Sequence, residues 1–139
     1  MNTAVQTRNF GVSANDVWAM DSWVENAATP WGVNERTIFG VRLCIAELAA
    51  NVLEHGRVRS ARDQIIVTIS HLSDGIEVEF LDSREAFDPT AKVVAAKSDS
   101  SETVTIGGHG LILVHAYADE LCYVNDGTYN RVKLKVKSA

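Results

Sequence analysis

Residues 34–56 read NERTIFGVRLCIAELAANVLEHG and form the longest helical pattern in the chain. Apolar residues recur in this stretch at spacings of three and four, which places them on one face of a helix: Ile38, Val41, Ile45, Ala49 and Val52. Three polar residues, Glu47, Asn51 and His55, lie four apart and share a second stripe. The stretch therefore predicts one helix with an apolar face for a core and polar side chains gathered on another side.

The length and composition of the chain predict one soluble domain. The chain has 139 residues, of which 46% are hydrophobic and 22% charged, and no apolar run approaches the ~20 residues that span a bilayer. The first residues lack a basic region followed by an apolar run, so no signal peptide is predicted. The formal net charge of -5 argues against nucleic acid as a direct partner. We therefore expect a single domain over residues 1–139 in the cytoplasm, without membrane or nucleic acid as partners.

The pattern outside the long helix predicts further elements in a definite order. A strand is expected at 5–12, a helix capped by Ser13 at 13–29, a hairpin at 64–72 and 75–82, a helix at 109–119 and a hairpin at 120–137. This order predicts an α/β (α+β) two-layer sandwich, in which a mixed, mostly antiparallel sheet has helices on one face. The long aperiodic segment between Asp82 and Gly107 is interpreted as a lid, with disorder as the alternative.

Two further patterns concern the cysteines and the last strand. Cys44 and Cys122 fall in a predicted helix and a predicted strand, match no common metal-ligand spacing, and are expected to be reduced and buried. The last strand alternates apolar and basic residues, which predicts one buried and one exposed face. Its lysines are interpreted as protection against edge pairing: Lys133, Lys135 and Lys137.

Two carboxylates and one amide are candidates for chemistry on a nucleotide. The amide oxygen of Asn51 is a suitable neutral ligand for Mg²⁺, and Glu47, one turn away, could act as a general base. Asp82 continues the apolar row of one strand face, so its carboxylate needs a donor such as the exocyclic amine of adenine. The alternatives are a solvated helix face for the first pair and a turn at the strand end for Asp82.

The stretch GGHGL at residues 107–111 precedes an apolar helical pattern. Glycines allow the backbone to approach phosphate oxygens, and the free N–H groups of a helix start attract anions. No GK[ST] follows, as a Walker loop would require, and no strand immediately precedes, as a dinucleotide fingerprint would require. The stretch is therefore interpreted as a phosphate cradle, with a flexible hinge as the alternative.

Taken in order, three stretches resemble the motifs of one ATP-binding family: ELAANVLEHG at 47–56, FLDSREAFDP at 80–89 and GGHGL at 107–111. They are similar to the N-box and the two glycine boxes of the family shared by DNA gyrase B, the Hsp90 chaperones, histidine kinases and MutL. The resemblance is closest to the branch of small anti-sigma factor serine-protein kinases. It implies the Bergerat-type ATP-binding sandwich.

The resemblance also implies roles for individual residues. Glu47 would be the catalytic base that prepares a serine of a partner protein, Asn51 would hold Mg²⁺, and Asp82 would accept from the adenine amine. The glycine boxes would place further residues at the ATP site: Ala86, Gly107, Gly108, His109, Gly110 and Leu111. The implied function is an anti-sigma-factor-type regulator with ATP- and Mg²⁺-dependent serine kinase activity on an antagonist protein. A sigma factor or another regulator would be its second partner, and a homodimer is common in this branch.

The chain departs from the family pattern at two positions. Arg84 replaces the first glycine of the first glycine box, so its side chain must swing aside, stack on the adenine or obstruct the site. His109 stands where an arginine is frequent and is a weaker phosphate clamp. These departures motivate an alternative function, a nucleotide-weak or non-catalytic protein-binding switch of the same fold. His55 is interpreted as a helix-end packing or capping residue.

Overall fold

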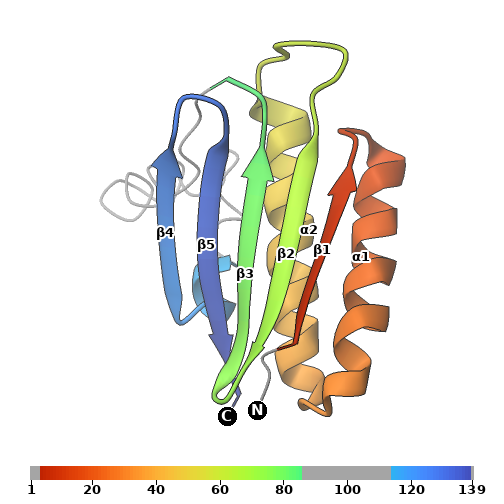
Figure 1. The fold of residues 1–139 in the computed structure, drawn as a ribbon, viewed down its shortest axis with the longest axis vertical. Coiled ribbons are helices and arrows are strands. Elements are labelled where there is room, and N and C mark those ends of the chain that lie inside the picture. Colours follow the sequence, from red (N-terminus) through yellow and green to blue (C-terminus); the bar gives the residue numbers. More distant parts are fainter. Residues whose placement is uncertain (1–3, 86–113, 139) are drawn as a thin grey trace, which may run out of the picture.

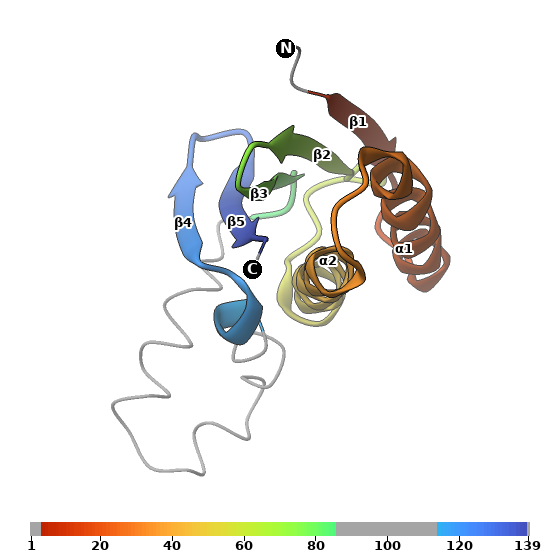
Figure 2. The same cartoon turned by 90° about the horizontal axis from the view of Figure 1, so that it is seen from below.

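The computed structural model describes residues 4–85 and 114–138. A five-stranded sheet has the strand order β1-β2-β3-β5-β4, and each of its pairings is antiparallel. Two long helices lie on one side of this sheet (Figure 1, Figure 2). The predicted fold class is thereby confirmed. The elements are β1 (Val5–Phe10), α1 (Ala14–Ala28), the short 3₁₀ helix η1 (Thr29–Trp31), α2 (Glu35–His55), β2 (Ile65–Leu72), β3 (Gly75–Asp82), β4 (Glu120–Asn125) and β5 (Asn130–Lys137).

Helix α2 begins and ends where the sequence predicts. The side chain of Asn34 accepts a hydrogen bond from the backbone N–H of Thr37 at 2.8 Å, which satisfies one of the free donors of the first turn. At the other end the N–H of Gly56 donates to Val52 O at 2.9 Å. The predicted apolar stripe of α2 is buried in full against the sheet and α1. The helix is thus fixed along its length by packing, and its polar stripe is held at a defined rotation.

The sheet presents its apolar rows to the helices. On β3 the buried row is Ile76, Val78, Phe80 and Asp82, as period two predicts. On β5 the buried row is Asn130, Val132, Leu134 and Val136. Antiparallel pairing places Asp82 directly opposite Asn130. Two polar residues therefore end two adjacent apolar rows at the same edge of the core.

Helix α1 completes the layer of helices beside α2. Ser13 accepts a hydrogen bond from the N–H of Asp16 at 3.2 Å, which confirms the predicted cap. Met20 and Val24 are fully buried, and the ring of Trp23 packs edge-on against Phe10 of β1 with centroids 5.8 Å apart. No helix within the described residues is long and apolar enough to cross a membrane.

Three details differ from the sequence predictions. Cys122 is exposed rather than buried, because it lies on the outward side of the edge strand β4, whereas Cys44 is buried as predicted. Strand β5 is an interior strand between β3 and β4, so its lysines do not protect an edge; Lys135 instead pairs with Asp74 at 2.8 Å. Within the described residues, the helix expected at 109–119 covers 114–117 and ends before the predicted boundary.

Candidate functional site

A small pocket opens where α2 crosses the ends of β3 and β5. Its internal volume is only about 10 Å³, with open space in front of it, and it brings together residues from two motifs that are 31 positions apart in the sequence. The pocket is lined by Leu48, Asn51, Val52, Phe80, Asp82, Asn130 and Val132. Its walls are apolar, and its three polar side chains lie on three different elements. This composition is typical of a site that binds a small, partly apolar ligand in one orientation.

Asp82 is the acidic residue among the described lining residues of this pocket, and 7% of its surface is exposed. Its Oδ1 atom accepts hydrogen bonds from the backbone N–H of Arg84 and from Asn130 Nδ2, both at 3.1 Å. Burial raises the pKa of Asp82, and the hydrogen bond from Asn130 opposes this rise. Its second oxygen, Oδ2, accepts no hydrogen bond from the residues that the structure describes. Asp82 is thus a buried carboxylate in which Oδ1 accepts hydrogen bonds from the described residues and Oδ2 is available to a ligand.

Asn130 is a member of this site that the sequence interpretation missed. Its side chain is 2% exposed, and besides Asp82 its Nδ2 atom contacts the carbonyl oxygens of Arg84 at 3.1 Å and Glu85 at 2.9 Å. The hydroxyl of Tyr123 donates to its Oδ1 at 2.6 Å. A signal was available, because period two places residue 130 on the same strand face as the buried apolar row of β5. Asn130 orients both the Asp82 carboxylate and the chain that follows it.

Asn51 faces the same pocket from α2 and is 7% exposed. Its Nδ2 atom donates to the carbonyl oxygen of Glu47, one turn earlier, at 3.0 Å. This bond fixes the orientation of the amide, and Oδ1 accepts no hydrogen bond from any described residue. The predicted polar stripe therefore includes one buried amide whose oxygen is available to a ligand. Glu47 itself is half-buried.

His55, the last residue of the polar stripe, and Cys44 do not line the pocket. His55 is half-buried in the last turn of α2, where its Nε2 lies 3.5 Å from the carboxylate of Glu54. Burial raises the pKa of Cys44 to about 12, and the negative charge of Glu47 adds to the rise. The Cys44 thiol therefore stays protonated at neutral pH, which makes it a poor nucleophile.

The side chain of Arg84 turns away from the pocket. Its Nη1 atom donates to the carbonyl oxygens of Val52 and Gly56 at the end of α2, each at 3.2 Å. Of the three conformations that the sequence leaves open, the structure has the first, in which the arginine swings aside. The guanidinium does not block the space in front of Asp82.

The sequence was compared with models of known protein families. Residues 12–136 match the family model of the histidine kinase-like ATPase domain. The chain belongs to this family. Membership implies an ATP-binding protein with kinase-type or ATPase chemistry, and a related protein supports the branch named above. The serine/threonine-protein kinase BtrW of Bordetella bronchiseptica is 24% identical over 139 residues, which is 100% of this chain and 98% of that protein.

Solved structures share the fold of this histidine kinase-like ATPase domain. The RsbU and RsbW domains of Rv1364c from Mycobacterium tuberculosis superpose with a TM-score of 0.70 at 14% identity, over 97% of this chain and 32% of that one. The histidine kinase domain of the blue-light activated kinase from Erythrobacter litoralis EL346 gives a TM-score of 0.54 at 14% identity, over 89% of this chain and 60% of that one. This chain thus spans about a third of the first structure's length and three fifths of the second's.

Several residues that the resemblance assigns to the ATP site lie outside the described residues. They include one residue of the first glycine box and the whole second box: Ala86, Gly107, Gly108, His109, Gly110 and Leu111. Residues 86–106 of the segment interpreted as a lid also lie outside. Their roles stay predictions, and the arguments below rest on the N-box, on Asp82 and on the residues that surround them.

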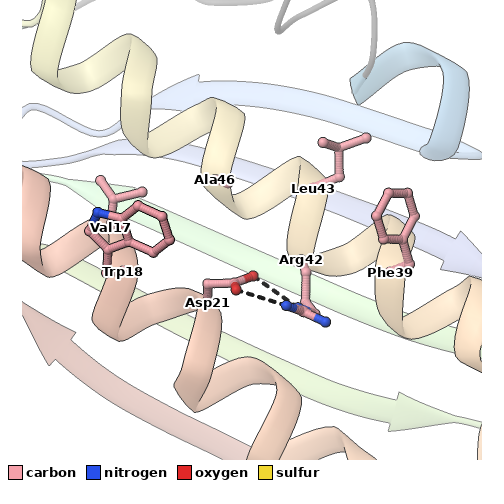
Figure 3. A pocket seen from close by; sticks show the side chains of 7 residues that line it. All are labelled: Val17, Trp18, Asp21, Phe39, Arg42, Leu43 and Ala46. Atoms are coloured by element: carbon pink, nitrogen blue, oxygen red, sulfur yellow. Dashed lines mark hydrogen bonds and ion pairs between the residues drawn. The ribbon is translucent and has the colours of Figure 1, made fainter.

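A second pocket lies between α1 and α2, on the side of the helices that faces away from the sheet (Figure 3). It is mainly apolar, and Trp18, 75% exposed, stands at one end of it while Phe39 stands at the other. Between the two helices, Asp21 receives two hydrogen bonds from Arg42, at 2.9 and 2.8 Å. This pair lowers the pKa of Asp21. Among the residues that the structure describes, neither Glu47, Asn51 nor Asp82 lines this pocket.

The Asp21–Arg42 pair predicts a modest effect on stability and none on ATP binding. Arg42→Met should lower the free energy of unfolding by about 1 kcal/mol, because the two hydrogen bonds to Asp21 and a more exposed one to Glu25 at 3.1 Å are lost while the apolar stem is kept. Denaturant unfolding measures this change. ATP affinity measured on the same sample should stay within twofold, and a larger loss would mean that this second pocket takes part in nucleotide binding.

Proposed function

We propose that this chain is an anti-sigma-factor-type regulator that transfers the γ-phosphate of ATP to a serine of an antagonist protein, with Mg²⁺ as cofactor. One observation carries this proposal above all. Asn51 from the N-box and Asp82 from the first glycine box line one pocket, and each holds an oxygen that takes no hydrogen bond from the described part of the chain. Two motifs that are distant in sequence thus place an available acceptor oxygen each in the same pocket.

The adenine end of the site is built by Asp82 and the apolar walls around it. Asp82 Oδ2 would accept a hydrogen bond from the exocyclic amine of the base, which removes the disadvantage of an underused buried carboxylate. The side chains of Val52, Phe80 and Val132 offer apolar surface to the base. Arg84 N–H and Asn130 hold the carboxylate in place before ATP arrives.

The phosphate end of the site would be served by Asn51. Its available Oδ1 and the orientation of its amide fit a Mg²⁺ ion, which prefers a few protein oxygens and takes its other ligands from water and phosphates. The described residues contain no group of three or more acidic, histidine or cysteine side chains that could hold a metal alone, so the ion would arrive with the nucleotide. Bound there, it would neutralise charge on the phosphate oxygens.

Glu47 would serve as the general base of the transfer. Its carboxylate accepts the proton of the partner's serine hydroxyl while the serine oxygen bonds to the γ-phosphorus of ATP. The bond between that phosphorus and the oxygen bridging to the β-phosphate breaks, and ADP leaves with the electron pair. Glu47 is half-buried one turn from Asn51, so a base and a metal ligand lie on the same side of α2.

The protein partners follow from the branch rather than from the pocket. We propose an antagonist protein as the phosphorylated substrate and a sigma factor or another regulator as the protein that is bound and inhibited. A homodimer of single domains spanning residues 1–139 is the proposed assembly. The similarity to BtrW, a serine/threonine-protein kinase, supports a serine or threonine as the acceptor.

The test of this function is phosphate transfer. The chain is incubated with labelled ATP, Mg²⁺ and the antagonist protein, and the acceptor site is mapped by mass spectrometry. A phosphoserine on the antagonist is expected. Binding of the antagonist without ATP binding would instead favour the alternative, a non-catalytic switch of the same fold.

Asn51→Ala should affect only the part of the ATP affinity that depends on Mg²⁺. ATP affinity in the presence of Mg²⁺ should fall about tenfold, because the ion loses one protein ligand, whereas affinity in EDTA should be unchanged. The helix should keep its stability, because alanine is a better helix former than asparagine. Calorimetric titration in the two buffers measures both values. An equal loss in both buffers would contradict the assignment of Asn51 to the metal.

A further inference from the structure

Arg84 joins the two walls of the pocket. Two residues after the end of β3, its backbone N–H donates to Asp82 Oδ1 at 3.1 Å, while its guanidinium donates to Val52 O and Gly56 O at the end of α2, at 3.2 Å each. Val52 O also accepts the Gly56 N–H at 2.9 Å, so the arginine adds a second hydrogen bond to it. The carbonyl groups of a last helical turn carry the negative end of the helix dipole, so a guanidinium suits them. One residue therefore contacts both the adenine acceptor and the helix that carries Asn51.

A second set of contacts holds the Arg84 side chain in this position. Its Nε atom lies 3.6 Å from Asp63 Oδ2, and the arginine and aspartate side chains are only 12% and 6% exposed. Asp63 is itself fixed, because the hydroxyl of Ser83 donates to its Oδ1 at 3.1 Å. Ser83 thus hydrogen-bonds the same carboxylate with which Arg84 forms an ion pair. The start of the glycine-box segment is anchored to the loop between α2 and β2.

Gly56 leaves room for this arrangement. A Cβ atom at position 56 would lie 3.0 Å from Arg84 Cδ and 2.7 Å from Val52 O. The glycine that ends α2 therefore also lets the arginine stem pass close to the helix. The lack of a Cβ at position 56 thus allows the close approach of both Val52 O and the arginine stem.

We propose that Arg84 is a positioning residue of the ATP site. It sets the register, meaning the relative position, between the wall that carries Asp82 and the wall on α2 that carries Asn51, here called the Asp82 wall and the Asn51 wall. This inference rests on the proposed function. Asn51 immediately precedes Val52, whose carbonyl Arg84 binds, so the arginine fixes the metal ligand relative to the adenine acceptor. Arginine at this position then aids binding of the magnesium complex of ATP, and restoring the family's glycine should weaken that binding.

The register between the walls has a specific readout, the gain in ATP affinity that Mg²⁺ provides. ATP in EDTA uses the Asp82 wall, whose hydrogen bond from the Arg84 backbone survives any side-chain change. ATP with Mg²⁺ must satisfy both walls at once. Loss of the Arg84 side chain should therefore reduce the Mg²⁺-dependent gain about tenfold and change affinity in EDTA by less than threefold.

The experiment is a calorimetric titration of ATP, in Mg²⁺ and in EDTA, into the full chain and four variants. Arg84→Met keeps the stem without donors, Arg84→Gly restores the family residue, and Arg84→Lys keeps one charged donor. Arg131→Met is the matched control, because Arg131 binds Glu79 at 2.6 Å and Asp126 at 3.2 Å away from the pocket. Its Mg²⁺-dependent gain should equal that of the wild type.

The expected order of the Mg²⁺-dependent gain is wild type and Arg131→Met, then Arg84→Lys, then Arg84→Met and Arg84→Gly. In a double-mutant cycle, Arg84→Met should add little to Asn51→Ala, since both act on the same wall. Higher affinity for ATP in Arg84→Gly, or a loss of the same size in both buffers, would overturn the inference. If Arg84→Met does not fold, Arg84→Lys tests the inference in its place. A Mg²⁺-dependent gain in Arg84→Lys equal to that of the wild type would also overturn the inference. Failure of the wild type to bind ATP would refute the proposed function instead.

Discussion

Asp82→Asn is expected to weaken ATP binding by roughly 100-fold, about 2.7 kcal/mol. Asparagine can keep its Oδ1 bonded to Arg84 N–H and Asn130, as Asp82 does at 3.1 Å. The Nδ2 group would then stand where Oδ2 accepts the amine of the base, so two donors face each other. Calorimetric titration with the magnesium complex of ATP measures the loss.

The same substitution should stabilise the protein without its ligand. Burial raises the pKa of Asp82 above the ordinary value of 3.8, so the folded state holds this proton more tightly than the unfolded state does. The contribution of this group to the free energy of unfolding is therefore lost as pH rises from about 4 through the folded-state pKa. The stability advantage of Asp82→Asn should be absent below pH 4 and reach its full size at neutral pH, measured by denaturant unfolding.

Asp74→Asn is the matched control for charge removal at an aspartate. Its carboxylate is exposed, and the hydrogen bond from Lys135 lowers its pKa, which is the opposite of the shift at Asp82. This substitution should leave ATP binding unchanged and should not stabilise the protein at any pH. Equal effects of the two substitutions on ATP affinity would remove the case for Asp82 as the adenine acceptor.

Glu47→Gln is expected to lower the rate of phosphate transfer by roughly 10³-fold while ATP affinity stays within about threefold. Glutamine keeps the size of the side chain on α2 but cannot accept the serine proton at neutral pH. Its neighbour Asn51 donates to the backbone carbonyl of residue 47, a bond that the substitution does not touch. Initial rates with labelled ATP and the antagonist protein measure the effect.

Glu54→Gln controls for a lost charge on the same helix, because Glu54 is exposed and lies nearly two turns further along α2. Its transfer rate should equal that of the wild type. Glu47→Gln must also retain the antagonist in a binding assay. A Glu47→Gln variant that binds both partners and transfers phosphate at the wild-type rate would exclude Glu47 as the base.

The helices and the inward-facing strand rows could be predicted from sequence because they depend on local periodicity. The caps at Ser13 and Asn34 and the alternation of β3 need only nearby residues. Asp82 could be proposed for the same reason, since its place on an apolar row is a property of one strand. Asn51 required the whole pattern, because its spacing from Glu47 alone is more typical of a solvated face.

The features that sequence reasoning missed depend on contacts between distant segments. Asn130 joins the site only through the pairing of β3 with β5, and the position of β5 inside the sheet follows from strand order rather than from its alternation. The direction of the Arg84 side chain depends on the end of α2, 28 residues before it. Cys122 is exposed because β4 is an edge strand, which its apolar neighbours do not reveal.

The most direct test of this account is a crystal structure of the chain with Mg²⁺ and a non-hydrolysable ATP analogue. The account predicts the base between α2 and β3, with its exocyclic amine within hydrogen-bond distance of Asp82 Oδ2, and Asn51 Oδ1 among the metal ligands. Arg84 should keep its bonds to Val52 O and Gly56 O. A nucleotide bound elsewhere, such as in the pocket between α1 and α2, or a base without contact to Asp82 would contradict it.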